Sequence, residues 1–331
     1  MNKTIQEIAD LAGVSKTTVS LVINGHGSKY RISKKTQQRI LDIVKEKKFT
    51  PNLVARGFRL KRTETIGLIV PDLTNWFFSQ ISHEIEMQAR RFDHQVLIAC
   101  SDDDEKTESE VIRNLHGRRV DGLIIASVMK KDQITKEVLS LDIPVVYIDR
   151  RIESDNVSWV TSDNYQGAYD LINYMCSKHH RQIYYLGGLK NISTSKNRLK
   201  GYRQALEDNG IRYRSEFVFQ KDYSIAAGYE LAGRMCKRQD GLPEAFFTAS
   251  ITLLEGALQF VCEMAGRIPE SLRIGTYDDH PFLDYLSVRI PSVRQNTRDI
   301  ARTAFGMIYD ALAGRQIVQH KTISPQIVVR D

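Results

Sequence analysis

The first residues of the chain place apolar side chains at the spacing of short helices. Residues 4–7 read T-x-x-E, a capping box in which the two ends of the motif satisfy each other's backbone N–H groups. This motif predicts a helix over residues 5–12, with Ile5, Ile8 and Ala9 facing inward. So short a helix needs partners to be stable in water.

A second helix follows after a sharp turn. Gly13 permits the left-handed backbone that such a turn needs, and Ser15 is a good N-cap for the next helix. Winding residues 16–23 at about 100° per residue gives one inward face, Val19, Val22 and Ile23, and one outward face, Lys16, Thr17, Ser20 and Leu21. Helix, tight turn and helix together predict a unit that sets its second helix into the major groove of DNA.

A third helix is expected after its N-cap Ser33, with a core stripe of Ile40, Leu41, Ile43 and Val44. Further on, Pro51 suits the first turn of another helix. Gly57 weakens that helix, and so short an isolated helix is marginal in water. We therefore expect the segment 50–60 to fold only when something holds it.

From residue 65 onward, continuous apolar runs alternate with helical stretches. The runs lie at residues 65–72, 95–102, 121–128, 144–150, 182–188, 216–220, 244–250 and 272–279. Continuous Val, Ile and Leu runs predict parallel strands that are covered on both faces, and the runs are numerous enough for two sheets. Two α/β lobes with a cleft between them follow from this pattern.

Ligands of open α/β sheets bind beyond the carboxyl ends of the strands. The polar residues at the expected ends are Asp72, Ser127, Asp149, Arg150, Thr248, Ser250, Asp278 and Asp279. A carboxylate such as Asp149 or Asp278 can accept hydrogen bonds from two neighbouring sugar hydroxyls, and Arg150 and Arg198 can hold a phosphate or a ring oxygen. Ion pairs between loops are the alternative interpretation of these residues.

Composition agrees with a soluble globular protein. The chain has 331 residues, 42% of them hydrophobic, with no apolar run as long as the ~18 residues of a membrane span and no secretory signal at its start. The cysteines, Cys100, Cys176, Cys236 and Cys262, lie far apart and form no C-x-x-C pair. We expect a cytoplasmic protein with buried free thiols, without a metal site and without a cofactor.

Charge is divided unevenly along the chain. Residues 1–62 hold fourteen Lys or Arg against four Asp or Glu, a net charge of +10. Because the whole chain carries +7, the other 269 residues carry −3. A basic head on a slightly acidic body indicates that the head binds a polyanion, since phosphate neutralisation releases counterions. A solvated basic surface is the alternative.

These features together resemble the LacI family of bacterial transcription regulators over the whole chain. The resemblance is carried by "TIQEIADLAGVSKTTVSLVING", by the linker "TPNLVARGFR" and by "TIGLIVPDLTNWFF". The segments "NGHGSKYRIS", "SHEIE", "LIACSDDD", "VDGLIIAS", "IDR" and "YYLGG" resemble the branch of sucrose-operon and fructose repressors. The implied fold is a helix-turn-helix head on a two-lobed body similar to periplasmic sugar-binding proteins. Three crossovers join the lobes, expected near residues 160–163, 290–293 and 323–325.

The resemblance implies a dimer on a pseudo-palindromic operator, with linkers that fold into hinge helices in the minor groove. In the family a hinge leucine enters between the central base pairs, and here the matching residue is Phe58, whose ring can also unstack a step. The residues expected to contact DNA are Thr4, Ser15, Lys16, Thr17, Ser20, Leu21, Asn24, Tyr30, Arg31, Asn52, Ala55, Arg56, Phe58 and Arg59. The side chain of Leu21 either contacts a thymine methyl group or packs on a neighbouring helix.

For the effector, the resemblance matches Arg198 to the family's effector-contacting arginine and Phe77, Arg150 and Gln295 to cleft positions. The expected effector-binding set is Asp72, Phe77, Ser127, Asp149, Arg150, Arg198, Ser250, Asp278 and Gln295. The predicted domains are a head over 1–49, a hinge over 50–62 and a body over 63–331. Within the body, the N-lobe is expected at about 63–161 and 292–323, and the C-lobe at about 162–291 and 324–331.

Two other classes of protein fit less well. An enzyme is disfavoured because the chain has no G-x-G-x-x-G after its first strand, no phosphate-binding P-loop motif, and no histidine partnered with a nucleophile. The acidic run at residues 102–106 is more simply a loop and a helix N-terminus than a metal site. A sugar-binding transport protein is disfavoured by the basic head and by the missing signal peptide.

The resemblance therefore implies a repressor of sucrose or fructose utilisation genes, with no catalytic residues. Its expected partners are double-stranded operator DNA, a second copy of itself and a fructose-like sugar or sugar phosphate that relieves repression, with no membrane. A dimer is favoured over a tetramer because no leucine heptads follow "SPQIVVRD". Two alternatives stay open within this class: a repressor that answers to a purine or another corepressor, and a global regulator of carbon flux that also activates.

Overall fold

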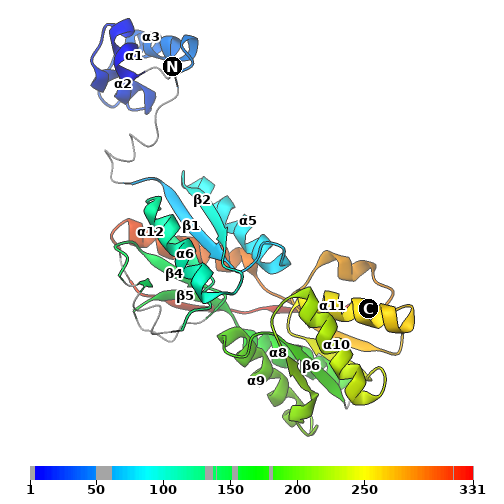
Figure 1. The fold of residues 1–331 in the computed structure, drawn as a ribbon. Coiled ribbons are helices and arrows are strands. Elements are labelled where there is room, and N and C mark those ends of the chain that lie inside the picture. The colour runs from blue at the N-terminus through cyan, green and yellow to red at the C-terminus, as the bar shows by residue number, and fades with distance from the viewer. Residues whose placement is uncertain are drawn as a thin grey trace. The chain divides into compact units, whose positions relative to one another are not determined.

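The computed structural model describes residues 4–49, 62–130, 137–138, 140–150, 156–178, 182–315 and 317–330. The chain divides into two compact units, Met1–Thr63 and Glu64–Asp331, which we call the head and the body and describe separately (Figure 1). The expected hinge helix and its residues Asn52, Ala55, Arg56, Phe58 and Arg59 lie outside the described residues.

The described part of the head, residues 4–49, contains the three predicted α-helices, α1 (Ile5–Ala12), α2 (Lys16–Ile23) and α3 (Lys34–Glu46). The capping box before α1 is present with both of its hydrogen bonds, and Gly13 ends α1 at a left-handed φ of +59°. Ser15 caps α2 and Ser33 caps α3, each accepting a backbone N–H with its hydroxyl oxygen. Local sequence signals thus set the helix boundaries of the head.

One residue of the predicted head core faces solvent instead. The core consists of the buried residues Ile8, Ala9, Ala12, Val19, Val22 and Ile40, with half-buried Ile5, Ile23, Ile43 and Val44 against it. Leu41, which was predicted to belong to the α3 stripe, is 45% exposed. Residues three and four positions apart share a helix face, so Ile43 and Val44 follow Ile40 inward, whereas Leu41 is turned about 100° away.

The cap of α2 gives a first testable prediction. Ser15 Oγ accepts the Thr18 N–H at 3.1 Å, so Ser15→Ala leaves that donor without its partner. We expect the variant to lower the stability of the head by about 1 kcal/mol, measured by hydrogen exchange of the α2 amides. Ser28→Ala, at an exposed position outside the helices, is the matched control and should change nothing. Equal exchange in both variants would rule out a capping role.

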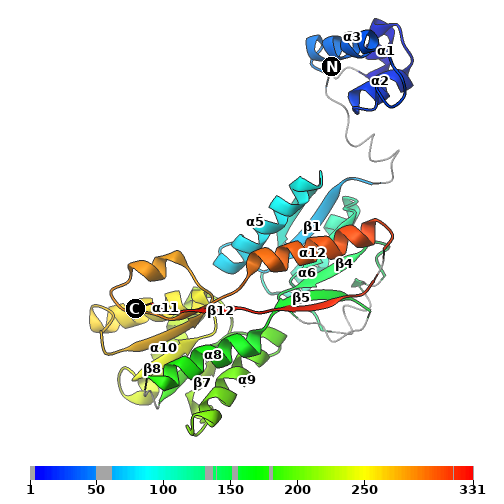
Figure 2. The same ribbon diagram turned by 180° about the vertical axis from the view of Figure 1, so that it is seen from behind.

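The first lobe of the body is a six-stranded parallel sheet in the order β11-β5-β4-β3-β1-β2. Its strands are β1 (Thr65–Val70), β2 (Gln95–Cys100), β3 (Gly122–Ile125), β4 (Val145–Ile148), β5 (Ser158–Ser162) and β11 (His320–Ile323). Helices α5 (Trp76–Arg91) and α12 (Thr297–Leu312) lie side by side on one face, and α6 (Glu105–Gly117) covers the other (Figures 1 and 2). Alternate residues of β1 enter the two cores, Leu68 on one face and Ile69 on the other.

The second lobe is another six-stranded sheet, in the order β12-β10-β9-β8-β6-β7. Its strands are β6 (Ile183–Gly187), β7 (Val218–Gln220), β8 (Ala245–Thr248), β9 (Arg273–Tyr277), β10 (Ser292–Arg294) and β12 (Gln326–Val328), of which β12 runs antiparallel. The covering helices are α8 (Asn164–Ser177), α9 (Ser193–Asp208), α10 (Ile225–Gln239) and α11 (Ile251–Ala265), with short 3-10 turns η1 (Ser215–Phe217) and η2 (Pro281–Tyr285). The two-lobed α/β body is confirmed.

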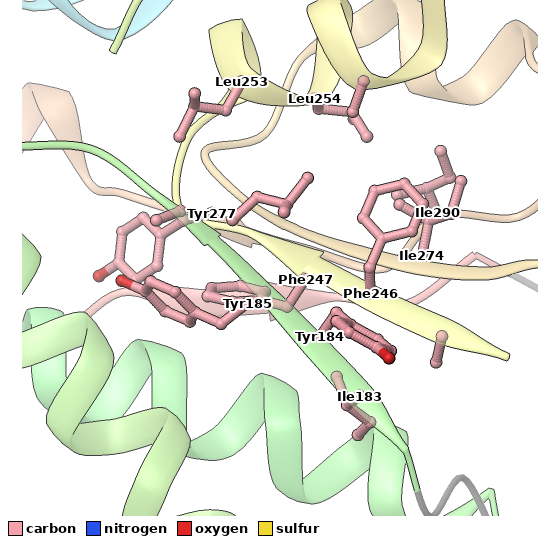
Figure 3. Packing of buried hydrophobic residues seen from close by; sticks show 14 of the residues in the cluster. Ile183, Tyr184, Tyr185, Phe246, Phe247, Leu253, Leu254, Ile274, Tyr277 and Ile290 are labelled. Atoms are coloured by element: carbon pink, nitrogen blue, oxygen red, sulfur yellow. The ribbon is translucent and has the colours of Figure 1, made fainter. Parts of the chain in front are cut away.

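Aromatic residues fill much of the second-lobe core. Figure 3 shows Tyr185, Phe247 and Tyr277 gathered at the sheet, with Leu253 and Leu254 reaching toward it from α11. The rings of Tyr185 and Phe247 have centroids 5.6 Å apart, within the range of attractive aromatic pairs. This packed core gives the strand ends of the second lobe a rigid base.

The chain passes between the lobes three times, as expected. The crossings lie between β5 and α8, between β10 and α12, and between β11 and β12. The second crossing comes later than residues 290–293, because Ser292–Arg294 pair with β9 and β12 in the second sheet. The expected boundaries assigned the stretch 292–294 to the first lobe. In the structure it is part of the second lobe.

The cysteines are free thiols, but not all of them are buried. Cys176 and Cys236 are buried, Cys100 is half-buried and Cys262 is exposed, which corrects the expectation of four buried thiols. Cys262 lies near the end of α11, on the solvent side of that amphipathic helix. Among the described helices, none combines the length and the hydropathy that crossing a bilayer requires.

Candidate DNA-binding face and effector pocket

The outward face of α2 carries the residues expected to contact DNA. Lys16 and Thr17 are exposed, and Ser20 and Leu21 are half-buried. Leu21 lies outside the apolar cluster that forms the described head core, which favours the interpretation that it faces a ligand rather than a neighbouring helix. Lys16, Thr17 and Ser20 thus give this face a cation and two hydroxyls, and Leu21 adds an apolar side chain, on a helix of the size that enters a major groove.

The other described candidates in the head have mixed roles. The Asn24 side-chain amide donates to the Ser20 carbonyl at 2.6 Å, so that amide serves to end α2. Tyr30 is exposed, and Arg31 is exposed at a left-handed φ of +56°. Thr4, like Ser15, uses its hydroxyl as a helix cap. Tyr30 and Arg31 are therefore the candidates outside α2 that have side chains available to a ligand.

A cavity of about 470 Å³ lies at the carboxyl ends of strands from both lobes. Seven of the nine residues predicted to bind an effector line it: Asp72, Phe77, Asp149, Arg150, Arg198, Ser250 and Asp278. The carboxyl ends of parallel strands meet at one edge of a sheet, which is why residues so far apart in sequence gather here. We call this cavity the effector pocket.

The remaining two predicted residues lie elsewhere. Gln295 donates from Nε2 to Asp278 Oδ1 at 2.6 Å and thereby supports a lining residue from behind. Ser127 lines a neighbouring cavity of about 560 Å³, and its Oγ accepts the Met129 N–H at 3.1 Å. The structure thus does not place Ser127 among the residues that line the effector pocket, although the neighbouring cavity shares Asp103 and Arg150 with it.

Sequence reasoning missed several lining residues. The polar ones are Asn75, Asp102, Asp103, Thr194, Asp222, Tyr223 and Ser224. Asp102 and Asp103 follow the end of β2 directly, so the strand-end signal that identified Asp72 was available for them as well. Asp222 and Tyr223 follow the three-residue strand β7, whose short apolar run gives a much weaker signal.

Arg150 is a buried cation that pairs only in part with the other described residues. Its side chain is 4% exposed, and Nη2 donates to Asp103 Oδ1 at 2.5 Å. Its Nε lies 3.7 Å from Asp149 Oδ2, too far for a hydrogen bond. Both Nε and Nη1 are buried without a hydrogen-bond partner among the described residues. Such donors are costly unless a ligand or water satisfies them.

Arg198 is held more tightly than Arg150. From α9 it donates Nε to Asn164 Oδ1 at 2.7 Å and Nη1 to the Ala249 carbonyl at 2.6 Å. Its guanidinium carbon lies 3.7 Å from the centroid of the Tyr277 ring, a cation–π contact. The guanidinium is therefore fixed in orientation at the wall of the pocket, which is what a ligand-binding arginine requires.

The pocket is crowded with carboxylates in unfavourable surroundings. Burial raises the pKa of Asp149 to about 6, although Arg150 and Arg198 draw that pKa downward. Burial also raises the pKa of Asp278, against the opposing effects of Arg198 and Gln295. Both aspartates have left-handed backbones, with φ of +63° and +71°. Strain and unfavourable ionisation in one cavity are typical of a ligand site.

The raised pKa of Asp149 predicts a pH effect. The folded value of about 6 exceeds the ordinary 3.8, so between pH 4 and 6 the native state binds more protons than the unfolded chain. Stability contributed by the protonated form is therefore lost as pH rises through 6. We expect Asp149→Asn to gain about 2 kcal/mol of stability relative to the wild type between pH 4.5 and 7.5, measured by urea unfolding. Parallel pH profiles for the two proteins would contradict this account.

Comparisons with known proteins agree with this geometry. A model described as "Bacterial regulatory proteins, lacI family" matches residues 4–52, and one described as "Periplasmic binding proteins and sugar binding domain of LacI family" matches residues 63–318. The sucrose operon repressor of Klebsiella pneumoniae is 38% identical over 312 residues, which cover 94% of this chain and 93% of that relative.

Two solved structures are similar in fold. The Cra transcriptional dual regulator from Pseudomonas putida in complex with fructose 1-phosphate matches with a TM-score of 0.74 at 28% identity, over 81% of this chain and 99% of that one. The Lac repressor dimer bound to operator and an anti-inducer matches with a TM-score of 0.87 at 22% identity, over 100% and 98%. The second likeness extends the agreement in fold to the whole chain.

Proposed function

This chain belongs to the LacI family of bacterial regulatory proteins, and on that premise we propose that it represses sugar-utilisation genes as an operator-binding homodimer. A fructose-like sugar or sugar phosphate in the effector pocket relieves the repression. As a transcription regulator the protein is not an enzyme. We further propose that it acts in the cytoplasm, bound to the nucleoid when it represses.

The observation that carries the proposal is the pocket's pairing of buried carboxylates with oriented arginines. A carboxylate accepts hydrogen bonds through two oxygens, so Asp149 and Asp278 suit the adjacent hydroxyls of a sugar ring. Both are at most 5% exposed and lie in one cavity of about 470 Å³, large enough for a sugar or a disaccharide. A purine offers fewer hydroxyls to these oxygens, which places the corepressor alternative second.

The side chain of Arg150 supports the proposal that the sugar carries a phosphate. Its Nε and Nη1, which have no hydrogen-bond partner in the part of the chain that the structure describes, are the kind of donors that a phosphate oxygen satisfies in a charge-assisted bond. The similar Cra regulator was crystallised with fructose 1-phosphate, and the similar Klebsiella repressor is named for the sucrose operon. A fructose phosphate would therefore offer hydroxyls to Asp149 and Asp278 and a phosphate to Arg150.

The proposed switch links this pocket to the linker. Without effector, the two bodies of a dimer hold both heads on the operator. Effector binding rearranges the lobes and separates the linkers. Such couplings are typically worth about 1–3 kcal/mol, or 5- to 150-fold in operator affinity.

Calorimetric titration tests the effector. Fructose, fructose 1-phosphate, sucrose and sucrose 6-phosphate are titrated into the full-length protein, with guanine as the purine comparison. We expect the fructose phosphate to bind tightest and to weaken a gel shift on the DNA upstream of the protein's own gene. Binding of guanine alone, with tighter operator binding, would replace the proposal with the corepressor alternative. Raised transcription from any bound promoter would show that the protein also activates.

An apolar edge of the first-lobe sheet supports the proposal of a homodimer. Strand β2 is an edge strand, and two of its apolar side chains, Leu97 and Ile98, are 39% and 40% exposed. An exposed apolar edge strand can pair with another chain, and monomeric proteins usually cover such an edge or place charged residues on it. We expect Ile98→Asp to shift the protein from dimer to monomer in sedimentation experiments and to weaken operator binding. Gln95→Asp, an equal charge change at the polar start of β2, is the control, and equal behaviour of both variants would count against this interface.

A further inference from the structure

The two lobes also touch through a pair of aromatic rings. Trp76 is the first residue of α5 in the first lobe, and His280 lies in the second lobe after β9. Their ring centroids are 4.3 Å apart with an interplanar angle of 58°. Neither ring lines the effector pocket or takes part in the proposed contacts with the effector.

Contacts with second-lobe residues hold both rings in place. The His280 Nδ1 accepts the Phe282 N–H at 3.0 Å, and the rings of His280 and Phe282 lie 4.8 Å apart. Trp76 and Phe282 are partly buried and pack against the second-lobe core. A side chain of the first lobe is thus seated in the apolar surface of the second.

The backbone on both sides connects this contact to the pocket. Asn75 caps α5 by accepting the Phe77 N–H at 3.0 Å, and these two pocket-lining residues flank Trp76 in sequence. Asp278, another lining residue, lies two positions before His280. A ligand that draws Phe77 or Asp278 toward itself therefore moves the segment that carries one of the rings.

We propose that Trp76 and His280 are positioning residues of the effector response: their ring contact sets one lobe on the other, and effector binding changes it. Aromatic pairs at this separation attract each other beyond their burial, so the contact favours one arrangement of the lobes over others. The inference rests on the proposed function, because it requires an effector in the pocket.

The contact itself is tested by fluorescence without any ligand. The chain has two tryptophans, and Trp159 stacks on His320 inside the first lobe, with centroids 4.8 Å apart and planes at 11°. In the Trp159→Phe protein the emission comes from Trp76 alone. Adding His280→Ala should shift that emission to longer wavelength, and adding His320→Ala should not. An emission unchanged by His280→Ala overturns the contact.

The positioning role is tested with fructose 1-phosphate on the full-length protein. Emission from Trp76 should change as calorimetry shows the pocket filling, whereas in the Trp76→Phe protein, where Trp159 reports, it should stay constant. We expect Trp76→Ala and His280→Ala to keep the effector affinity within about threefold of the wild type. An effector usually changes operator affinity by about 5- to 150-fold. In the two variants this change should be at least about fivefold smaller than in the wild type.

The outcomes separate the two proposals. A wild-type fold-change in both alanine variants overturns the positioning role and leaves the proposed function standing. If calorimetry shows that none of the four sugars binds to the wild type, the proposed function fails and the positioning role fails with it. In that case the ligand-free emission shift still decides whether the rings form the contact between the lobes.

Discussion

Replacing Arg198 by alanine is expected to abolish the response to effector while the protein still binds its operator. Arg198 is buried at the pocket wall, and two of its nitrogens are anchored to Asn164 and Ala249, which aims the guanidinium at the ligand. A hydrogen bond to a charged group is worth about 1.5–3 kcal/mol, so the effector affinity should fall by about 10- to 150-fold. Calorimetry with fructose 1-phosphate measures this loss, and operator binding should stay near the wild-type value.

Two further variants keep this result interpretable. Arg203→Ala removes an exposed arginine from the same helix, whose partner Glu207 lies one turn away, and should leave the effector response unchanged. Arg198→Lys keeps the charge but loses the bond from Nε to Asn164, and an intermediate affinity is expected. If Arg198→Ala instead loses operator binding while its thermal unfolding is unchanged, Arg198 belongs to the DNA response and not to the pocket.

Reversing the charge of Lys16 is expected to cost operator affinity about 100-fold and to leave the effector affinity unchanged. Lys16 is exposed at the start of α2, where a cation meets either a guanine edge or a phosphate. Each phosphate contact that is lost should also lower the number of ions released on operator binding by about one, which makes about two for the two heads of a dimer. Fluorescence anisotropy with labelled operator at several salt concentrations measures both quantities.

Lys237→Glu is the matched control for Lys16→Glu. Lys237 is an exposed lysine in the last turn of α10, so its substitution changes the net charge equally but on the second lobe. It should shift operator affinity only slightly. Equal losses in the two variants would mean that overall charge, and not the α2 face, governs binding.

The features that the sequence predicted correctly depend on short-range signals. A capping box, a glycine turn and a serine cap fix α1 and α2 within a few residues, because the relevant hydrogen bonds span three or four positions. The apolar runs that became β1 and β9 were likewise visible, since strands covered on both faces have no polar alternation. The strand ends then placed Asp72 and Asp278 at one edge without further information.

The features that were missed depend on contacts between distant parts of the chain. Strands β10 and β12 have three residues each and exist because they pair with each other and with β9. Leu41 is apolar in the sequence, but only the packing of three short helices decides that it faces solvent. The ring contact of Trp76 with His280 joins opposite lobes, so no local pattern predicts it.

The central claim is that a basic head binds operator DNA through counterion release and that the sugar pocket controls that binding. Its most direct test is the operator affinity of the full-length protein across a salt titration, with and without saturating fructose 1-phosphate. We predict a loss of affinity of about 10³-fold or more between 50 and 200 mM salt, and a 5- to 150-fold weakening by the sugar phosphate at each salt concentration. An affinity indifferent to salt, or identical curves with and without every candidate sugar, would contradict it.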